Sequence, residues 1–303
     1  MSDPIEHFRL AIAAAGMEAP DVIHDDGVIH RFSPSGRRGG ESAWYVLYSD
    51  GVAAGSFGCW REGMQSSWCS KSDNAMTPAE RDAHKQRIKA MKAQRDEAEA
   101  ARQREEADKA ATRWQEGSIP GAHPYLARKG VRAYGIQQDG QTLLIPLRDT
   151  AGKLHSLQTI TPDGEKRFKG RMKGCYHSIG GKPPVVCLVI AEGYATGASI
   201  HEATLWPVAV AFNAGNVVPV AVALHKKYPQ LQIVIAADDD YRTPGNPGLI
   251  AAKQAALAVG GFVVVPQFPA DRPPKATDFN DLAALAGLSA VRACFLEIGW
   301  VVC

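Results

Sequence analysis

The sequence lacks the features of an exported, membrane-spanning or motor protein. Its 303 residues include six cysteines but no Cys-x-x-Cys pair, which predicts reduced thiols and a cytoplasmic location. It has no run of about eighteen apolar residues and no basic, apolar leader in MSDPIEHFRLAIAAAG, so neither a membrane span nor export is expected. A G-x-x-x-x-G-K-S/T loop is also missing, which excludes a recognisable helicase motor. Because the net charge is only +2, any nucleic-acid contact must come from a local basic patch.

Three short apolar runs lie between residues 184 and 241: PVVCLVIAEG, LWPVAVAFNAG and LQIVIAADDDY. Each suits a buried parallel strand, which predicts an α/β fold, and two of them end in acidic residues. Residues just past the carboxyl ends of parallel strands line the functional crevice of such a sheet. Glu192 follows the first run and Asp238, Asp239 and Asp240 follow the third, so these carboxylates are predicted to face one another as a cation site.

Strand alternation separates the three consecutive aspartates. Asp238 and Asp240 are expected on one side, and Asp239 on the other. Two carboxylates on one side suit a hard divalent ion such as Mg²⁺. The alternative is a solvated turn or a helix N-cap, both of which attract acidic residues.

In this order, Glu192-Gly193 and the Asp238 to Asp240 run resemble the TOPRIM domain, which bacterial-type primases, type IA and II topoisomerases and some nucleases share. The resemblance implies a parallel sheet flanked by helices. It also implies that Glu192 does general acid/base work and that Asp238 and Asp240 hold Mg²⁺ or Mn²⁺. A later segment, KATDFNDLAALAG, is similar to the acidic motif of primase TOPRIM domains and implies two further ligands, Asp278 and Asp281.

These matches favour the primase branch and predict a TOPRIM catalytic domain over residues 184–303. The last residues, LSAVRACFLEIGWVVC, are expected to form a helix and a strand that pack on the sheet.

Residues 118–183 are predicted to form a small, mixed, basic subdomain. The segment HPYLARKG is typical of a short helix, and the alternating runs that follow predict an antiparallel sheet with glycine-containing turns. This segment resembles the basic subdomain that precedes the TOPRIM sheet in primases. Its cations are predicted to hold the phosphates of a template or a nucleotide; they are Arg148, Lys166, Arg167, Lys169, Arg171 and Lys173. The alternative is a solvated hairpin edge that lysines protect from aggregation.

Residues 75–117 predict one long charged helix. Thr77 suits the N-cap, Pro78 the first helical position, and Glu80 the reciprocal position of a capping box. Sustained apolar heptads are missing, so a coiled coil is not expected. The interpretation is a solvated connector, with nucleic-acid contact through its Arg and Lys residues as the alternative.

Residues 1–74 are expected to form a β-rich, ribbon-like unit that begins with a short helix. Its layout resembles the zinc ribbon that precedes the TOPRIM domain in many primases, although Ser33-Pro34-Ser35 stands at the first knuckle. The nearby N and S ligands have unusual spacings; they are His24, His30, Cys59 and Cys69. A metal-free sheet held by aromatic side chains is therefore predicted, with Trp44 and Tyr45 in its core.

The resemblance implies a DNA primase that makes short primers on single-stranded DNA in plasmid, mobile-element or phage replication. Its substrates would be nucleoside triphosphates, and a separate helicase is a candidate partner. Divalent ions would stabilise the charge that builds up as a 3′ oxygen attacks an α-phosphate. Two alternatives stay open: a TOPRIM nuclease with water as the nucleophile, and a non-catalytic replication accessory protein that binds single-stranded DNA. A topoisomerase is not favoured, because it needs a strand-cleaving Tyr on a further large domain.

Overall fold

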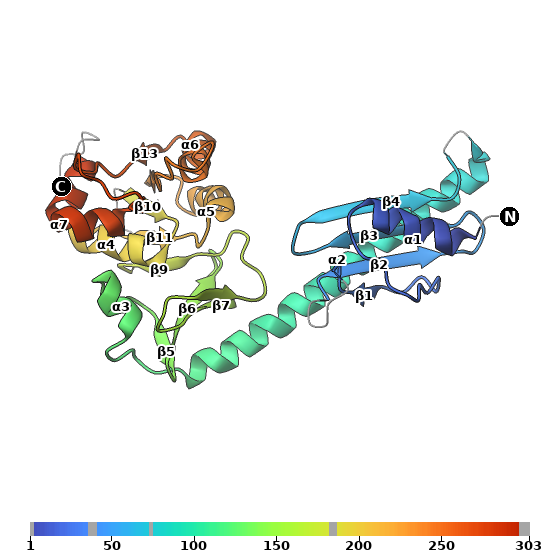
Figure 1. Ribbon diagram of the computed structural model, residues 1–303, viewed down its shortest axis with the longest axis horizontal. Coiled ribbons are helices and arrows are strands. Elements are labelled where there is room, and N and C mark those ends of the chain that lie inside the picture. The colour runs from blue at the N-terminus through green and yellow to red at the C-terminus, as the bar shows by residue number, and fades with distance from the viewer. Residues whose placement is uncertain (1–2, 36–40, 73–74, 182–186, 297–303) are drawn as a thin grey trace. The chain divides into compact units, whose positions relative to one another are not determined.

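The computed structural model describes residues 3–35, 41–72, 75–181 and 187–296 (Figure 1). The chain divides into two compact units, residues 1–101 and 102–303, and the boundary falls inside one long helix. The finer division expected from the sequence, into segments 1–74, 75–117, 118–183 and 184–303, stays a prediction. The start of the last segment and the expected terminal strand lie outside the described residues.

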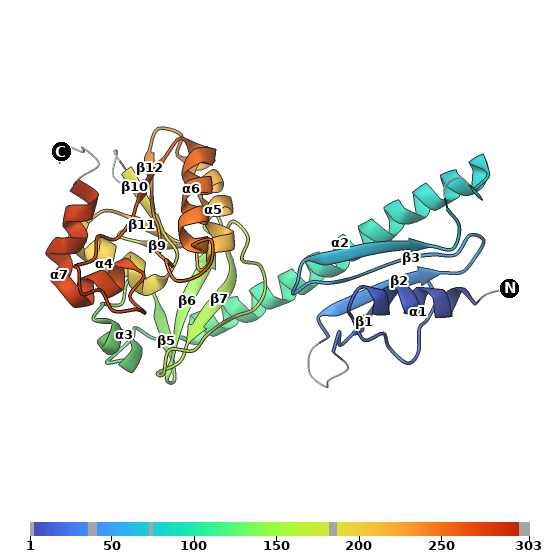
Figure 2. The same cartoon turned by 45° about the horizontal axis from the view of Figure 1, so that its top comes forward.

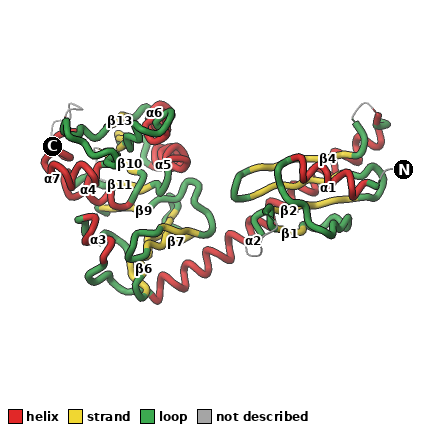
Figure 3. The backbone as a smooth tube through the Cα atoms, viewed as in Figure 1, coloured by secondary structure: helices red, strands yellow, loops and turns green. Residues whose placement is uncertain are grey.

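The first unit is a small antiparallel sheet with a helix on it (Figure 3). Helix α1 spans Pro4–Ala14, and Asp3 caps it by accepting a hydrogen bond from the Ile5 backbone N–H at 2.9 Å. Phe8 of α1 is fully buried against Tyr45 and Phe57, as edge-on aromatic pairs. The strands follow the order β1-β2-β3-β4, with bounds β1 His30–Phe32, β2 Ala43–Tyr48, β3 Ala54–Cys59 and β4 Met64–Cys69. The predicted β-rich unit with buried Trp44 and Tyr45 is therefore confirmed.

Helix α2 spans Pro78–Glu116 and begins at the predicted capping box. The Thr77 backbone N–H donates to Glu80 Oε2 at 2.8 Å, and the Glu80 N–H donates back to Thr77 Oγ1 at 3.3 Å. The helix is not solvated on all sides, because Met91 is buried and packs beside Trp44 in the first unit. This part of the prediction is wrong. A few apolar residues among many charges were enough to give α2 a buried stripe.

The second unit contains a four-stranded antiparallel sheet in the order β5-β6-β7-β8. Its elements are α3 Pro124–Lys129, β5 Gln137–Asp139, β6 Thr142–Arg148, β7 Leu154–Ile160 and β8 Lys166–Phe168. Strand alternation gives the sheet two different faces. On one face Leu144 and Leu157 pack with Ala110 of α2, and on the other Leu143 and Ile160 join the main core.

The main sheet of this unit has five strands in the order β13-β12-β10-β11-β9, all parallel except the edge strand β9. The strands are β9 His177–Ile179, β10 Cys187–Ala191, β11 Val208–Val210, β12 Gln232–Ala236 and β13 Phe262–Val264. The helices are α4 Tyr194–Thr204, α5 Ala214–Lys227, α6 Pro247–Val259 and α7 Phe279–Leu296. Figure 2 shows α4 and α7 on one side of the sheet, with α5 and α6 on the other. The predicted α/β sheet flanked by helices is confirmed.

The two central strands bring their carboxyl ends together. β10 and β12 are hydrogen-bonded neighbours, and Ala191 pairs with Ala236 at the end of the ladder. Both strands are buried on both faces, which is why they read as continuous apolar runs rather than alternating ones. Glu192 and Asp238 therefore leave the same edge of the sheet, one strand apart.

Helix α7 is long and apolar enough to span a membrane by length and composition alone, although a third of the segment (33%) is buried in the fold. Gly287 interrupts it with a φ of 81° and a ψ of 169°. Phe279, Leu282 and Phe295 on its inner side are buried in the main core. Its apolar composition is thus that of a helix covering a sheet.

Candidate active site

Glu192 lies one residue beyond β10, half-buried at the carboxyl edge of the sheet. Its carbonyl oxygen accepts the Phe212 N–H at 2.7 Å, which fixes the backbone at this point. Burial raises the pKa of the Glu192 carboxyl, and the nearby Asp240 raises it further. The backbone N–H of Ala214 and the ammonium of Lys166 act in the opposite direction. Its raised pKa makes the Glu192 carboxyl a better proton acceptor than an ordinary surface glutamate.

Asp238 follows β12 and is the most perturbed acid of the site. Burial raises its pKa to about 8, with further increases from Asp278, Glu192 and Asp240. Its Oδ1 atom is buried and has no hydrogen-bond partner within the described part of the chain. A buried acceptor without a donor is costly, so the group is either protonated or neutralised by a cation.

Asp240 lies close to Asp238, and both contact the start of α6. A Cβ placed on Gly248 would be 3.0 Å from the Cβ of Asp238 and 3.2 Å from Oδ2 of Asp240. Asn246 caps α6 through its side-chain oxygen, and this puts the positive end of the helix next to the two carboxylates. Asp238 and Asp240 thus both lie against Gly248, and their sharing of one side as metal ligands stays a prediction.

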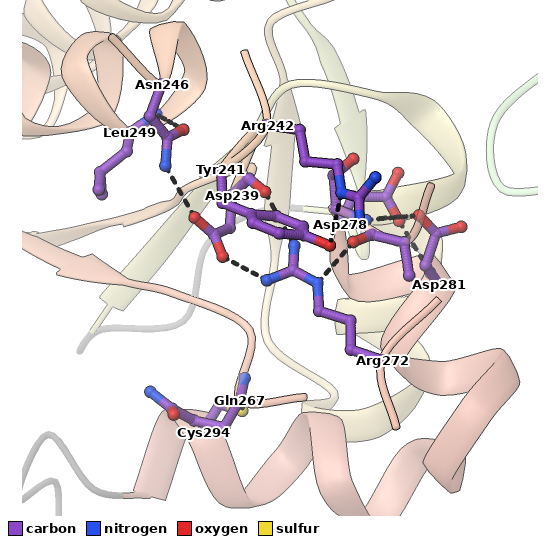
Figure 4. A network of polar contacts seen from close by, with 12 residues as sticks. Asp239, Tyr241, Arg242, Asn246, Leu249, Gln267, Arg272, Asp278, Asp281 and Cys294 are labelled. Carbon is purple, nitrogen blue, oxygen red and sulfur yellow. Dashed lines mark hydrogen bonds and ion pairs between the residues drawn. The ribbon is translucent and has the colours of Figure 1, made fainter. Parts of the chain in front are cut away.

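Asp239 has different partners. Its carboxylate accepts a 2.5 Å hydrogen bond from Arg272 and a 2.7 Å bond from the side chain of Asn246 (Figure 4). Arg272 also donates to the carbonyl oxygens of Asp239 and Ala276, both at 2.8 Å. Its guanidinium lies 4.1 Å from the ring centre of Tyr241, and Figure 4 shows the two side chains next to each other. Asp239 is thus a structural anchor, whereas its two neighbours have no comparable cation partner among the described side chains.

Asp278 and Asp281 form a reciprocal cap at the start of α7. The Asp281 N–H donates to Asp278 Oδ1 at 2.8 Å, and the Thr277 N–H donates to Asp281 Oδ2 at 2.9 Å. Thr196 of α4 donates to the second oxygen of Asp278 at 3.0 Å, and Lys129 lies 3.8 Å from Asp281. The two carboxylates thus cap α7, while burial and Asp281 raise the pKa of Asp278. Asp278 still acts electrostatically on Asp238 and Glu192.

The donor set fits a divalent cation held partly by water. Within the described ranges, no three His, Cys, Asp or Glu side chains are grouped closely enough to enclose a metal ion by themselves. Mg²⁺ does not need such a cage, because it keeps several waters and takes one or two carboxylates. The unpaired Oδ1 of Asp238 and the Asp240 carboxylate beside it are the oxygens that this chemistry needs.

The structure separates the six predicted phosphate-binding cations. Lys166 is the one that acts on the acidic site, since its charge lowers the pKa of both Glu192 and Asp238. Arg167 is paired with Glu165 at 2.7 Å, and strand alternation turns it to the opposite face of the sheet. Arg148 lies over the ring of Trp114 and donates to the Gly152 carbonyl oxygen. The remaining three are exposed in the segment that begins in β8; they are Lys169, Arg171 and Lys173.

Four residues that contact the predicted acids were not predicted as site residues from the sequence. They are Lys129, Thr196, Gly248 and Arg272. Thr196 and Gly248 carried a weak signal, because each lies in the first turn of a helix that follows an acidic strand end. Lys129 and Arg272 carried none. They lie in other parts of the chain, and only the fold brings them to Asp281 and Asp239.

The four N and S ligands considered for zinc do not converge in the first unit. Cys59 is buried in the hydrophobic core with its thiol directed to Ser42, and Cys69 lies 3.9 Å from His84. His30 stacks on His24, and its Nε2 atom hydrogen-bonds to an exposed aspartate. These contacts are those of ordinary packing.

Comparison with known proteins adds three findings. Residues 187–289 match the Toprim domain family. A DNA primase TraC of Escherichia coli is 38% identical over 283 residues, which is 88% of this chain and 26% of the relative. A second DNA primase TraC of Escherichia coli is 35% identical over 309 residues, which is 93% of this chain and 20% of the relative. The chain thus spans about a quarter or less of the length of these relatives.

Two solved structures resemble the chain more distantly. The zinc-binding and RNA polymerase domains of the Aquifex aeolicus primase have a TM-score of 0.44 and 13% identity, covering 98% of this chain and 86% of that one. The primase fragment of the bacteriophage T7 primase-helicase protein has a TM-score of 0.44 and 18% identity, covering 61% and 76%.

Proposed function

Residues 187–289 are a Toprim domain, and from this premise we propose that the chain is the primer-synthesising part of a DNA primase. The reaction would be nucleotidyl transfer from nucleoside triphosphates onto a short primer on single-stranded DNA, in plasmid or mobile-element replication. The identity to DNA primase TraC over most of this chain supports the proposal. The cytoplasm would be its location, and a separate replicative helicase a candidate partner.

The proposal that the reaction depends on a divalent cation rests on one observation. The Oδ1 atom of Asp238 is buried without a partner, and three further acids, Glu192, Asp240 and Asp278, act on the same carboxyl group. Such a cluster of like charges destabilises the fold unless protons or a cation neutralise it, since each uncompensated buried charge is costly. A divalent cation, Mg²⁺ or Mn²⁺, is the partner that oxygen-only donors select.

The acids and Lys166 would have different roles in phosphoryl transfer. Asp238 and Asp240 would hold the divalent ions, and Asp278 would add its negative charge next to Asp238. When bound, these ions supply positive charge to the α-phosphate and to the departing pyrophosphate. Glu192, with a raised pKa, would accept the proton of the attacking 3′ hydroxyl or orient a water. Lys166 would attract the triphosphate to the acidic edge of the sheet, because its charge acts on both Glu192 and Asp238.

The experiment is primer synthesis on single-stranded DNA with labelled nucleotides and Mg²⁺ or Mn²⁺. Asp238→Asn is compared with Asp271→Asn, which makes the same chemical change at an exposed position. Short products that disappear with Asp238→Asn and persist with Asp271→Asn support the proposal. Degradation of the template in place of synthesis would assign a nuclease. Binding without either activity would assign an accessory protein.

A further inference from the structure

Tyr125 is a buried residue near the acidic site that has no role in the chemistry described above. It lies in the first turn of α3, is 2% exposed, and belongs to the main core together with Tyr194, Phe279 and Leu282. Its hydroxyl oxygen is buried and has no hydrogen-bond partner among the residues that the structure describes. Buried tyrosine hydroxyls usually have a partner, because an unsatisfied one costs free energy. Phenylalanine would fill the same space without this cost.

The Tyr125 ring is held in place by α3 and by the β7–β8 turn. His123 caps the helix by accepting the Tyr125 backbone N–H at 3.2 Å. The guanidinium of Arg128 lies 5.9 Å from the centre of the Tyr125 ring, and a Cβ on Gly164 would lie 3.5 Å from the ring edge. These contacts restrict the ring, so the fold fixes where the hydroxyl lies.

The same helix is joined to the acids at the start of α7. The side-chain amide of Asn280 donates to the Lys129 carbonyl oxygen at 2.7 Å, and the Lys129 ammonium lies 3.8 Å from Asp281. Burial raises the pKa of the Tyr125 hydroxyl to about 12, with a further increase from the negative charge of Asp278. The phenol and the Asp278 carboxylate are therefore in electrostatic contact.

Asp278 can accept more hydrogen bonds than it has. Its Oδ1 accepts the Asp281 N–H at 2.8 Å, and its second oxygen accepts the Thr196 hydroxyl at 3.0 Å. Each carboxylate oxygen has two lone pairs, so each can accept one more bond. Among the acids, Asp278 has the largest charge effect on Asp238. A donor that holds the Asp278 carboxylate would therefore act on the proposed cation site.

We propose that Tyr125 is a positioning residue of the acidic site, and that its hydroxyl donates to the Asp278 carboxylate when a divalent cation is bound at Asp238. Once the repulsion among the acids is relieved, the carboxylate can adjust to the phenol, which holds it without adding charge. In the metal-free protein the same hydroxyl is left without a partner. The inference rests on the proposed function, because it deepens the role of the cation site.

The test measures Mn²⁺ binding by the full chain, from the electron paramagnetic resonance signal of free Mn²⁺. Tyr125→Phe removes only the hydroxyl, and the dissociation constant should rise about threefold to tenfold, which is the contribution of one hydrogen bond. Tyr134→Phe is the matched control. The hydroxyl that it removes donates to Glu202, in the last turn of α4, at 3.2 Å. The control should bind Mn²⁺ as tightly as the native chain.

Thermal unfolding in EDTA separates this role from a structural one. Tyr125→Phe should unfold at the same temperature as the native chain or at a higher one, because the hydroxyl has no partner without the cation. Tyr134→Phe should unfold at a lower temperature, because it loses a hydrogen bond. If Tyr125→Phe is also destabilised in EDTA, the hydroxyl already has a partner in the metal-free protein and the inference is wrong.

An Asp278→Ala background identifies the partner of the hydroxyl. Without that carboxylate, Tyr125→Phe should change the dissociation constant for Mn²⁺ by less than about twofold. A full effect that persists without Asp278, or no effect of Tyr125→Phe in the native background, would overturn the inference. If the native chain binds no Mn²⁺, or if Asp238→Asn binds it as tightly, the proposed function fails together with the inference. Binding that depends on Asp238 but not on Tyr125 rejects the inference alone.

Discussion

Neutralising Asp238 in the metal-free protein is expected to stabilise the second unit at alkaline pH. The native carboxyl has a pKa of about 8 in place of 3.8, because burial and three neighbouring acids disfavour its charged form. For an acid whose folded pKa is raised, stability is complete below the unfolded pKa and is lost as the pH rises towards the folded pKa. Asp238→Asn removes this loss, since an amide does not ionise.

The size of the effect follows from the two pKa values. Between pH 3.8 and pH 8 the native protein should lose about 1.4 kcal/mol for each pH unit, which amounts to roughly 3 kcal/mol at pH 6 and roughly 5 kcal/mol at pH 8. The variant should therefore be more stable than the native chain by a few kcal/mol at pH 8 and by little at pH 4.

Native-state hydrogen exchange of the β12 amides, in EDTA from pH 5 to pH 8.5, reports the stability of this unit. Asp239→Asn is the matched control. It makes the same change one residue away but breaks the Arg272 ion pair, so it should destabilise. The reasoning is refuted if the free energy of unfolding changes with pH by the same amount in Asp238→Asn as in the native chain. Adding Mg²⁺ should stabilise the native chain at pH 8 and have a smaller effect on the variant.

Three further outcomes are expected. Gly248→Ala places a Cβ 2.7 Å from the carbonyl oxygen of Asp238, so the aspartate segment or the start of α6 must move, and steady-state kinetics should show kcat reduced about tenfold or more. Lys166→Gln removes the cation that lowers the pKa of Glu192, so the acidic limb of the pH–rate profile should move to higher pH. Met91→Ala empties a buried position on α2, and hydrogen exchange of the β2 amides should show about 2 to 5 kcal/mol lost from the first unit.

The parts of the fold that were predictable are those in which local chemistry and burial agree. β10 and β12 are buried on both faces, so they appear in the sequence as unbroken apolar runs, and the acids that follow them mark the edge of the sheet. The start of α2 at Thr77 and the end of α3 at Gly130 also follow from local rules. A capping box and a left-handed glycine satisfy backbone groups within a few residues.

The unpredicted features depend on contacts between distant segments. The charged composition of α2 indicated a solvated helix, and the partner that buries Met91, Trp44, comes from a strand. The basic stretch around β8 appeared as one patch. Its division into two faces requires the register of β8 on β7, which a short exposed strand does not encode.

The run of three aspartates shows how the fold distinguishes neighbouring identical residues. Asp239 receives the guanidinium of Arg272, which is itself held between the rings of Tyr241 and Phe268 at 4.1 Å from each. This pairing stabilises the loop that joins β12 to α6. The Asp239–Arg272 ion pair thereby holds Asp238 in a position where the charged form of its carboxyl is unfavourable. One neutralised aspartate beside one whose charge is unfavourable is the arrangement that the proposed cation site requires, because the charge of Asp238 is then left for the cation to neutralise.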